Sequence, residues 1–408
     1  MNTSSTSAPR ASSNSRVMTS PSKARPMPVR SLPAGRLACI IAMAALLASC
    51  AGPSGPRLAE VPSRAFAPPS GALNKSRWVP VTWAELPGFE EDALFEGWNA
   101  WIKSCERPGP VFAPLCSEVR RLSIGSATDQ RAWMRARLQP YRIESLQGAP
   151  EGLLTSYYEP VLKASRQPGA GYGVPLYRTP TTLGSRKPWF SRQEIDTLPQ
   201  ARAALAGREI AWVADPIDAL VLHIQGSGRL TLSEADGASR TVRVAFAGSN
   251  EQPYRSVNQW LLTQGVSKIN PWPDATKAWA SDNPQRVQEL LWSNPRYVFF
   301  REEALSDFDA AFGPKGAQGV ALTPGRSIAV DPGSIPYGTP VWLASSGSAA
   351  TLQKLVLAQD TGSAIVGAVR ADYFAGTGAE AGKLASRFNQ PLRLWALWPK
   401  QTPKEKAP

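Results

Sequence analysis

Residues 355–367 read LVLAQDTGSAIVG, and they place Asp360 at the end of a short apolar run. A run of Leu, Val and Ala that is broken by Thr-Gly is typical of a buried strand ending in a turn. A carboxyl group at the mouth of such a strand is partly removed from water, which raises its pKa and lets it keep a proton near neutral pH. The stretch therefore predicts a sheet-rich domain and a candidate general acid.

Two further aspartates lie at similar positions on either side of this stretch. Residues 326–343 read RSIAVDPGSIPYGTPVWL and put Asp331 at a Pro-Gly turn between two strands. Residues 370–378 read RADYFAGTG and put Asp372 just before a predicted helix. Because Asp is common in turns, any one of these aspartates taken alone is better explained as a turn-capping residue.

Short apolar segments broken by Gly and Pro continue the pattern along the chain, and five helical stretches interrupt them. The expected strands are 153–158, 219–224, 241–246, 326–330, 340–343, 355–359 and 392–397. The expected helices are 89–104, 128–138, 256–265, 283–293 and 379–388, with Leu94, Trp98 and Trp101 on one face of the first. These patterns predict a mainly β protein with flanking helices.

Elimination leaves carboxylates as the groups for acid/base chemistry. The single histidine, His223, lies in the run LVLHI, which is typical of a buried strand, so we interpret it as structural. Because no second histidine is available to act as the base, the sequence disfavours Ser–His–Asp and Cys–His nucleophile systems. There is no Walker loop, and the glycines at 226 and 228 lack the third glycine of a dinucleotide fingerprint. Two cysteines and one histidine do not make a usual zinc site.

The order and spacing of several motifs together resemble one known family. AVDPGSIPYGTPV, AQDTGSAIVG and RADYFAGTG, in this order, resemble the 3D domain, which is named for its three aspartates. Upstream, SYYEP (156–160), DPID (215–218), IQGSG (224–228), NPRYVFF (294–300) and LTPGRS (322–327) extend the likeness. Over about residues 78–400, the sequence resembles the membrane-bound lytic murein transglycosylase A family.

The resemblance implies a fold and a set of site residues. The fold is a double-psi β-barrel domain, built from residues 78–160 and 254–400, plus a smaller inserted β-domain, residues 161–253. The catalytic acid/base is Asp360, and no metal or cofactor is expected. The supporting residues are Asp331, Asp372 and Thr361, and the residues lining the glycan groove are Tyr157, Tyr158, Gln225 and Ser227.

The resemblance also implies cleavage of the β-1,4 bond between N-acetylmuramic acid and N-acetylglucosamine, leaving 1,6-anhydro ends. Two alternatives stay open. A hydrolase would pair Asp360 with Asp331 or Asp372 and incorporate water, and a non-catalytic lipoprotein would only bind peptidoglycan. The sequence departs from the family pattern at Ser363, at Val366 and in the stretch NEQPY (250–254).

The N-terminus predicts export and lipid anchoring. Residues 1–49 carry six basic and no acidic residues and end in an apolar run, as in a signal peptide. The sequence LASC, followed by Ala51, resembles a bacterial lipobox, so Cys50 is the expected lipidation site, with the outer membrane as destination. An ordinary cleaved signal with a chance cysteine is the alternative. Residues 50–77 are interpreted as a tether and residues 401–408 as a tail.

Cysteines and charge add weaker constraints. Cys39 falls in the leader, which leaves Cys105 and Cys116 close together in an oxidising compartment, either as a disulfide or as two buried thiols. The formal charge of +13 falls to +7 without the leader. A moderate positive charge suits a polyanion such as peptidoglycan, but it also serves solubility. Expected partners are glycan strands, outer-membrane lipid and complexes for cell-wall synthesis, but not nucleic acid.

Overall fold

The computed structural model describes residues 74–233, 239–266 and 272–400. The expected signal peptide, the lipidation site Cys50, nearly all of the expected tether and the tail lie outside the described residues. The described strands form two sheets, which confirms the expectation of a mainly β protein with helices. Among the described residues, no helix combines the length and the apolar character needed to cross a bilayer.

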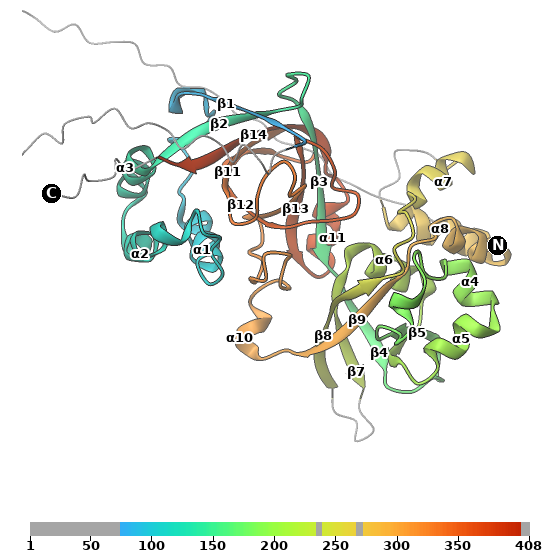
Figure 1. Ribbon diagram of the computed structural model, residues 1–408. Helices are drawn as coiled ribbons and strands as arrows, with labels where there is room; N and C mark the ends of the chain where they lie inside the picture. The colour runs from blue at the N-terminus through green and yellow to red at the C-terminus, as the bar shows by residue number, and fades with distance from the viewer. Residues whose placement is uncertain (1–73, 234–238, 267–271, 401–408) are drawn as a thin grey trace, which may run out of the picture. The chain divides into compact units, whose positions relative to one another are not determined.

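The first sheet closes into a barrel. Its strands run in the order β1-β2-β14-β11-β12-β10-β13-β3, and β14 also pairs with β3, so the strands from β14 to β3 form a closed ring (Figure 1). Their bounds are β1 Arg77–Pro80, β2 Leu138–Glu144, β3 Gly152–Glu159, β10 Ser327–Val330, β11 Pro340–Ser346, β12 Thr351–Asp360, β13 Arg370–Thr377 and β14 Asn389–Pro399. The apolar runs of the sequence supply its core, in which Ile328, Val341, Val356 and Leu394 are fully buried.

The second sheet follows β3 in the chain. Its order is β5-β6-β4-β7-β8-β9, with β4 Val161–Ser165, β5 Val174–Tyr177, β6 Glu209–Val213, β7 Ser227–Ser233, β8 Ser239–Ser249 and β9 Val298–Ala304. This sheet extends past residue 253, where the sequence analysis ended the inserted domain. The reason is that β9 pairs antiparallel with β8, and Val298 and Phe300 complete its apolar core.

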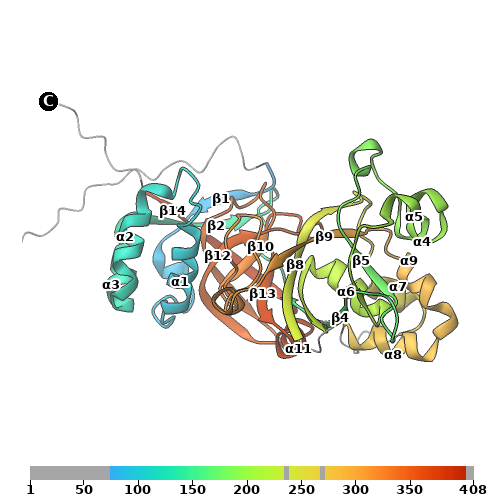
Figure 2. The same cartoon turned by 90° about the horizontal axis from the view of Figure 1, so that it is seen from below.

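Helices flank both sheets (Figures 1 and 2). Beside the barrel lie α1 Phe95–Ser104, α2 Cys116–Arg121 and α3 Ala127–Arg137, and α11 Ala379–Ala385 packs on β13 and β3. The other helices are α4 Arg192–Thr197, α5 Pro199–Leu205, α6 Pro216–Gln225, α7 Val257–Thr263, α8 Asp274–Asp282, α9 Val287–Trp292 and α10 Asp307–Ala310. Trp98 and Trp101 of α1 are buried and pack with Trp342 of β11; Leu94 packs there too, but it precedes the helix at φ +62° instead of lying on its face, because the expected helix 89–104 begins only at Phe95.

The segment that we expected to be a strand at 219–224 is instead helix α6. The Asp215 side chain accepts from the N–H of Ile217 (2.7 Å), Pro216 occupies the first turn, and Gly226 ends the helix at φ +80°. These start and stop signals decide the conformation. The residues are apolar on nearly every side because the helix packs between two apolar clusters, one with Leu222 and the other with Leu220.

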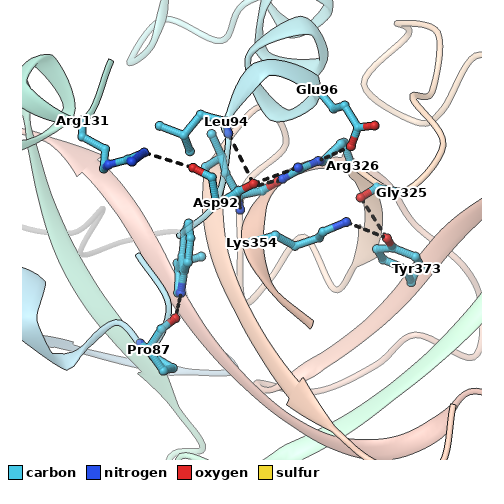
Figure 3. Close-up of polar contacts among 11 residues, drawn as sticks. Pro87, Asp92, Leu94, Glu96, Arg131, Gly325, Arg326, Lys354 and Tyr373 are labelled. Atoms are coloured by element: carbon cyan, nitrogen blue, oxygen red, sulfur yellow. Dashed lines mark hydrogen bonds and ion pairs between the residues drawn. The ribbon is translucent and has the colours of Figure 1, made fainter. Parts of the chain in front are cut away.

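A disulfide and buried ion pairs hold the elements in place. Cys105, directly after α1, forms a disulfide with Cys116. Arg326 donates to both carboxylate oxygens of Asp92 (2.7 and 2.9 Å) and also reaches Glu96 (Figure 3). This cluster ties the segment before α1 to the start of β10.

A second buried cluster joins the two sheets. The carboxylate of Glu159, at the end of β3, accepts from Arg229 (2.8 Å) and Arg243 (2.6 Å) of the second sheet. It also accepts from the hydroxyl of Thr377 in the barrel (2.8 Å). Because Glu159 is fully buried, both of its oxygens depend on these protein donors.

Candidate active site

Three neighbouring barrel strands bring Asp360 and Asp372 to the same level. Ala329 of β10 is in register with Asp360 of β12 on one side and with Asp372 of β13 on the other. Asp372 is in turn in register with Thr155 of β3. The pairing of β10 with β12 shifts between Ile328 and Ala329, so register gives the level of the two carboxyl groups but not their face. They are near enough for the charge of Asp360 to raise the pKa of Asp372.

Asp360 is half-buried at the end of β12 and accepts two hydrogen bonds. The hydroxyl of Tyr157 donates to its Oδ2 (2.7 Å), and the backbone N–H of Ala317 donates to its Oδ1 (2.9 Å). Removal from water raises the pKa of Asp360 above its ordinary value, and these two bonds, with one from Thr361 N–H, only partly oppose the rise. The side chain is therefore able both to hold a proton and to accept one.

The pKa of Asp372 is shifted further from its ordinary value than that of Asp360. Burial raises its pKa to about 6, against the opposing effects of the Thr155 hydroxyl and the Arg370 guanidinium, while the charge of Asp360 adds to the rise. The Thr155 hydroxyl donates to Asp372 Oδ1, and Arg370 donates to the same hydroxyl oxygen (2.8 Å). Asp360 and Asp372 thus influence each other's charge.

Asp331 and Thr361 form hydrogen bonds that hold backbone segments in place, and neither lines the cavity described below. The Asp331 carboxylate accepts from Lys75 (2.8 Å), Gly333 N–H (3.0 Å) and Gly367 N–H (2.9 Å). Burial alone would raise the pKa of Asp331, but these three donors outweigh it and keep the pKa low. The Thr361 hydroxyl donates to the carbonyl of Val330 (2.9 Å), so both residues join the turns that follow β10 and β12.

A cavity of about 920 Å³ opens beside the two carboxyl groups. It is lined by residues of β3, α6, the start of α7 and the loop after β12, among them Tyr157, Gln225, Tyr254, Asp372 and residues 362–365. Asp372 lines this cavity, whereas Asp360 does not: Asp360 lies next to it, bonded to the lining residue Tyr157 and two residues before the lining loop 362–365. The arrangement places a perturbed carboxyl group at the edge of a polar groove, as acid catalysis requires.

Two of the four predicted groove residues line the cavity and two do not. Tyr157 and Gln225 line it. Tyr158 packs its ring against Gly382, and its backbone N–H donates to the Gln225 side chain (3.0 Å), which fixes the orientation of that glutamine. Ser227 is nearly buried in β7, opposite Ala245 of β8.

The sequence analysis missed several lining residues that stand next to recognised motifs. Arg370 precedes Ala371-Asp372 in the third aspartate motif, and Thr155 directly precedes SYYEP. Tyr254 ends the NEQPY stretch, and burial raises its pKa, with a contribution from the nearby charge of Asp372. Their position beside the motifs was the signal that could have identified them, because the paired strands that carry the motif residues bring neighbouring residues to the same edge of the sheet.

Binding of a metal ion would require several ligating side chains close together in the described part of the chain. Within residues 74–233, 239–266 and 272–400, no group of three or more His, Cys, Asp or Glu side chains is arranged to hold a metal ion. His223 is buried, its Nδ1 accepts a hydrogen bond from Arg192 (3.0 Å), and it is not among the residues that line the cavity.

Comparison with known proteins agrees with this geometry. Residues 153–301 match the MltA specific insert domain, and residues 326–398 match the 3D domain. The chain is 31% identical over 279 residues to the membrane-bound lytic murein transglycosylase A of Escherichia coli K12, covering 66% of this chain and 72% of that protein. This chain belongs to the membrane-bound lytic murein transglycosylase A family.

Solved structures of relatives agree with the fold. The lytic transglycosylase LtgG of Burkholderia pseudomallei is 41% identical, with a TM-score of 0.56 over 83% of this chain and all of that one. A membrane-bound lytic murein transglycosylase from Agrobacterium tumefaciens is 27% identical, with a TM-score of 0.67 over 79% and 97% of the two chains. The predicted fold class of the family, a double-psi β-barrel with an inserted β-domain, is confirmed.

The departures from the family pattern fall at and near the groove. Ser363 lines the cavity, whereas Val366 is 60% exposed in the same loop. In the NEQPY stretch, Gln252 donates to the carbonyl of Trp189 (2.8 Å), and Glu251 pairs with Lys187 at the surface. Of these four residues, only Ser363 is placed to contact a ligand in the cavity.

Proposed function

We propose that this protein is a peptidoglycan lytic transglycosylase in which Asp360 is the acid/base residue. Membership of a family whose relatives are named lytic murein transglycosylases supports the reaction type. The observation that carries the assignment of Asp360 is its place next to the cavity, half-buried, bonded to the lining residue Tyr157 and with a raised pKa. A peptidoglycan strand is the substrate.

The first step is proton donation to the glycosidic oxygen. Asp360 donates its proton to the oxygen between N-acetylmuramic acid and N-acetylglucosamine, and the bond breaks toward an oxocarbenium-like centre. The Tyr157 hydroxyl and the Ala317 N–H, which bond the two oxygens of Asp360, stabilise the carboxylate that results. The two donors also fix the direction in which the carboxyl group points.

The second step closes a ring within the muramic residue. The Asp360 carboxylate takes the proton of the C6 hydroxyl, whose oxygen bonds C1 to give a 1,6-anhydro end. One carboxyl group suffices because the nucleophile is already attached to the sugar, so no second carboxylate is needed to hold a water. Asp331 does not compete for this role, since its oxygens are occupied by Lys75 and two backbone N–H groups.

Asp360→Asn tests the assignment. The full-length variant should release no soluble muropeptides from purified sacculi, while its circular dichroism and melting temperature match those of the wild type. Asp282→Asn, at the exposed end of α8, is the matched control and should keep wild-type turnover. Turnover by a folded Asp360→Asn protein would remove Asp360 from this role.

Mass spectrometry of the products distinguishes this reaction from its alternatives. Ring closure leaves muropeptide ends that are lighter, by the mass of one water, than the ends left by a hydrolase. A protein that only binds would sediment with sacculi and release nothing. Products that carry water would overturn the transglycosylase proposal.

We also propose that the protein is anchored by acylated Cys50 to the periplasmic face of the outer membrane. The signal-like N-terminus and the lipobox-like LASC sequence support this proposal. The names of the curated relatives, which describe them as membrane-bound, agree with it. Complexes with cell-wall synthesis proteins would follow from this location.

A further inference from the structure

A short hairpin, residues 313–322, packs against the strand end that carries Asp360. At its tip, the N–H of Ala317 donates to Asp360 Oδ1 (2.9 Å). The approach is close, because a Cβ atom at Gly316 would clash with the carbonyl oxygen of Gln359. Only a glycine allows the hairpin backbone to come near enough for the Ala317 bond.

The side chain of Gln318 ties this hairpin to the end of α1. Its Oε1 accepts from the Ser104 hydroxyl (3.1 Å), and its Nε2 donates to the carbonyls of Ser104 (3.3 Å) and Arg107 (3.2 Å). Gln359 also donates to the Ser104 hydroxyl (2.8 Å). Gln318 directly follows Ala317, and Gln359 directly precedes Asp360. The Ser104 hydroxyl therefore holds one chain neighbour of each of the two residues that the Ala317–Asp360 hydrogen bond joins.

The end of α1 is itself a firm support. Cys105, the next residue after Ser104, is linked to Cys116 by the disulfide. Arg120 of α2 donates to the carbonyl of Cys105 (2.6 Å). The hairpin is therefore attached through Gln318 to a cross-linked pair of helices rather than to a loose loop.

We propose that Gln318 is a positioning residue for the reaction, which acts by holding the Ala317 N–H on Asp360. The inference rests on the proposed function of Asp360 as the acid/base residue. Gln318 does not bond Asp360 itself, and the polar atoms of its side chain are engaged by Ser104 and the carbonyl of Arg107, so its effect on the acid passes through Ala317. Loss of the Gln318 side chain would change the position of the Asp360 carboxyl group, and small displacements of a catalytic group lower the reaction rate strongly.

Gln318→Met tests the proposal, because it keeps the length of the side chain and removes its hydrogen bonds. With purified sacculi as substrate, we expect kcat to fall about tenfold, since misplacement by about 1 Å costs up to about a hundredfold, while KM stays unchanged. The alkaline limb of the kcat–pH profile should move to higher pH. The hydrogen bond from the Ala317 N–H lowers the pKa of Asp360. If that bond is weakened, the pKa of Asp360 rises, and Asp360 stays protonated up to a higher pH.

Two further variants separate positioning from general damage. Ser104→Ala removes the shared hydroxyl and should reproduce both effects, and the double variant should lose little more than either single one. Gln193→Met, on the exposed side of α4, is the control and should change neither kcat nor the pH profile. Asp360→Asn in the same assay reports separately on the proposed function.

The proposal is overturned if Gln318→Met and Ser104→Ala keep wild-type kcat and an unmoved alkaline limb. It is equally overturned if kcat falls only in proportion to a lost folded fraction, measured by thermal unfolding, while the limb stays in place. A loss of turnover with a moved limb and an unchanged folded fraction supports it.

Discussion

Asp331, Asp360 and Asp372 carry the same carboxyl group, and their surroundings give them three different acidities. Asp331 has three donors, which outweigh its burial and hold its pKa low. Asp360 also has three donors, the Tyr157 hydroxyl and two backbone N–H groups, but none of them carries a charge and burial outweighs them, so its pKa rises. For Asp372, burial dominates and raises the pKa to about 6. At this scale, the balance of desolvation against donors separates the proposed acid from a structural clamp.

Asp372 should leave a signature in the pH dependence of stability. Its pKa is 3.8 when unperturbed and about 6 in the folded protein, so its protonated form stabilises the fold below the lower value. That contribution is lost as the pH rises through about 6. Asp372→Asn does not titrate, so the melting temperature of the wild type minus that of the variant should fall between these values and then level off. Thermal melts across this range measure it, and a constant difference would contradict the shifted pKa.

At the scale of elements, buried polar contacts set where helices and strands meet. Asp92 accepts from Arg326 at the start of β10 and from the backbone N–H of Leu355 in β12 (2.9 Å). Helix α1 begins three residues after Asp92 and packs on β12 at Gly97, where a side chain would have little room against Leu355. The ion pair thus fixes the entry of α1 onto the barrel (Figure 3).

Breaking this pair should be costly. Arg326→Met leaves the Asp92 carboxylate buried without its guanidinium, and we expect a loss of about 3–5 kcal/mol in the free energy of unfolding. Denaturant unfolding measures this loss. Arg286→Met removes an arginine from an exposed pair with Glu289 and should change stability little. An Arg326 variant as stable as the Arg286 variant would show that the buried pair contributes nothing.

At the scale of the whole molecule, the chain leaves the barrel after β3, builds a second sheet and returns to the barrel at β10. The buried Glu159 cluster lies at the point of departure and bonds both sheets. The cavity draws its lining from both parts, with Tyr157 from the barrel and Gln225 from α6. The proposed groove is therefore a product of the insertion.

The proposed anchor is also a property of the whole chain and has a direct test. Cys50→Ala should lose incorporation of labelled palmitate and should no longer partition with the membrane fraction, because acyl chains supply the binding energy. Cys39→Ala, in the expected leader, should label as the wild type does. A wild-type protein that takes up no label would contradict lipidation at Cys50.

The sequence alone determined the β character of the chain, five of the barrel strands (β3, β10, β11, β12 and β14) and the motif aspartates, but it missed β1, β2 and β13. Short apolar runs such as 355–359 are interrupted by Gly and Pro, and these local signals act through the backbone of a few neighbouring residues. Local signals also determined helix α7: the expected helix 256–265 starts at Ser256, and the side chain of Ser256 caps α7 by accepting from Gln259 N–H (3.2 Å). Family motifs extended this to the barrel with an insert.

Only the tertiary structure decided which residues meet. It assigned β9 to the second sheet, made 219–224 a helix between two apolar clusters, and separated Ser227 from the cavity. It also brought Gln318 to Ser104, which is 214 residues away in the chain. Such contacts depend on strand pairing and on the burial of both partners, and neither quantity is carried by the local sequence around one residue.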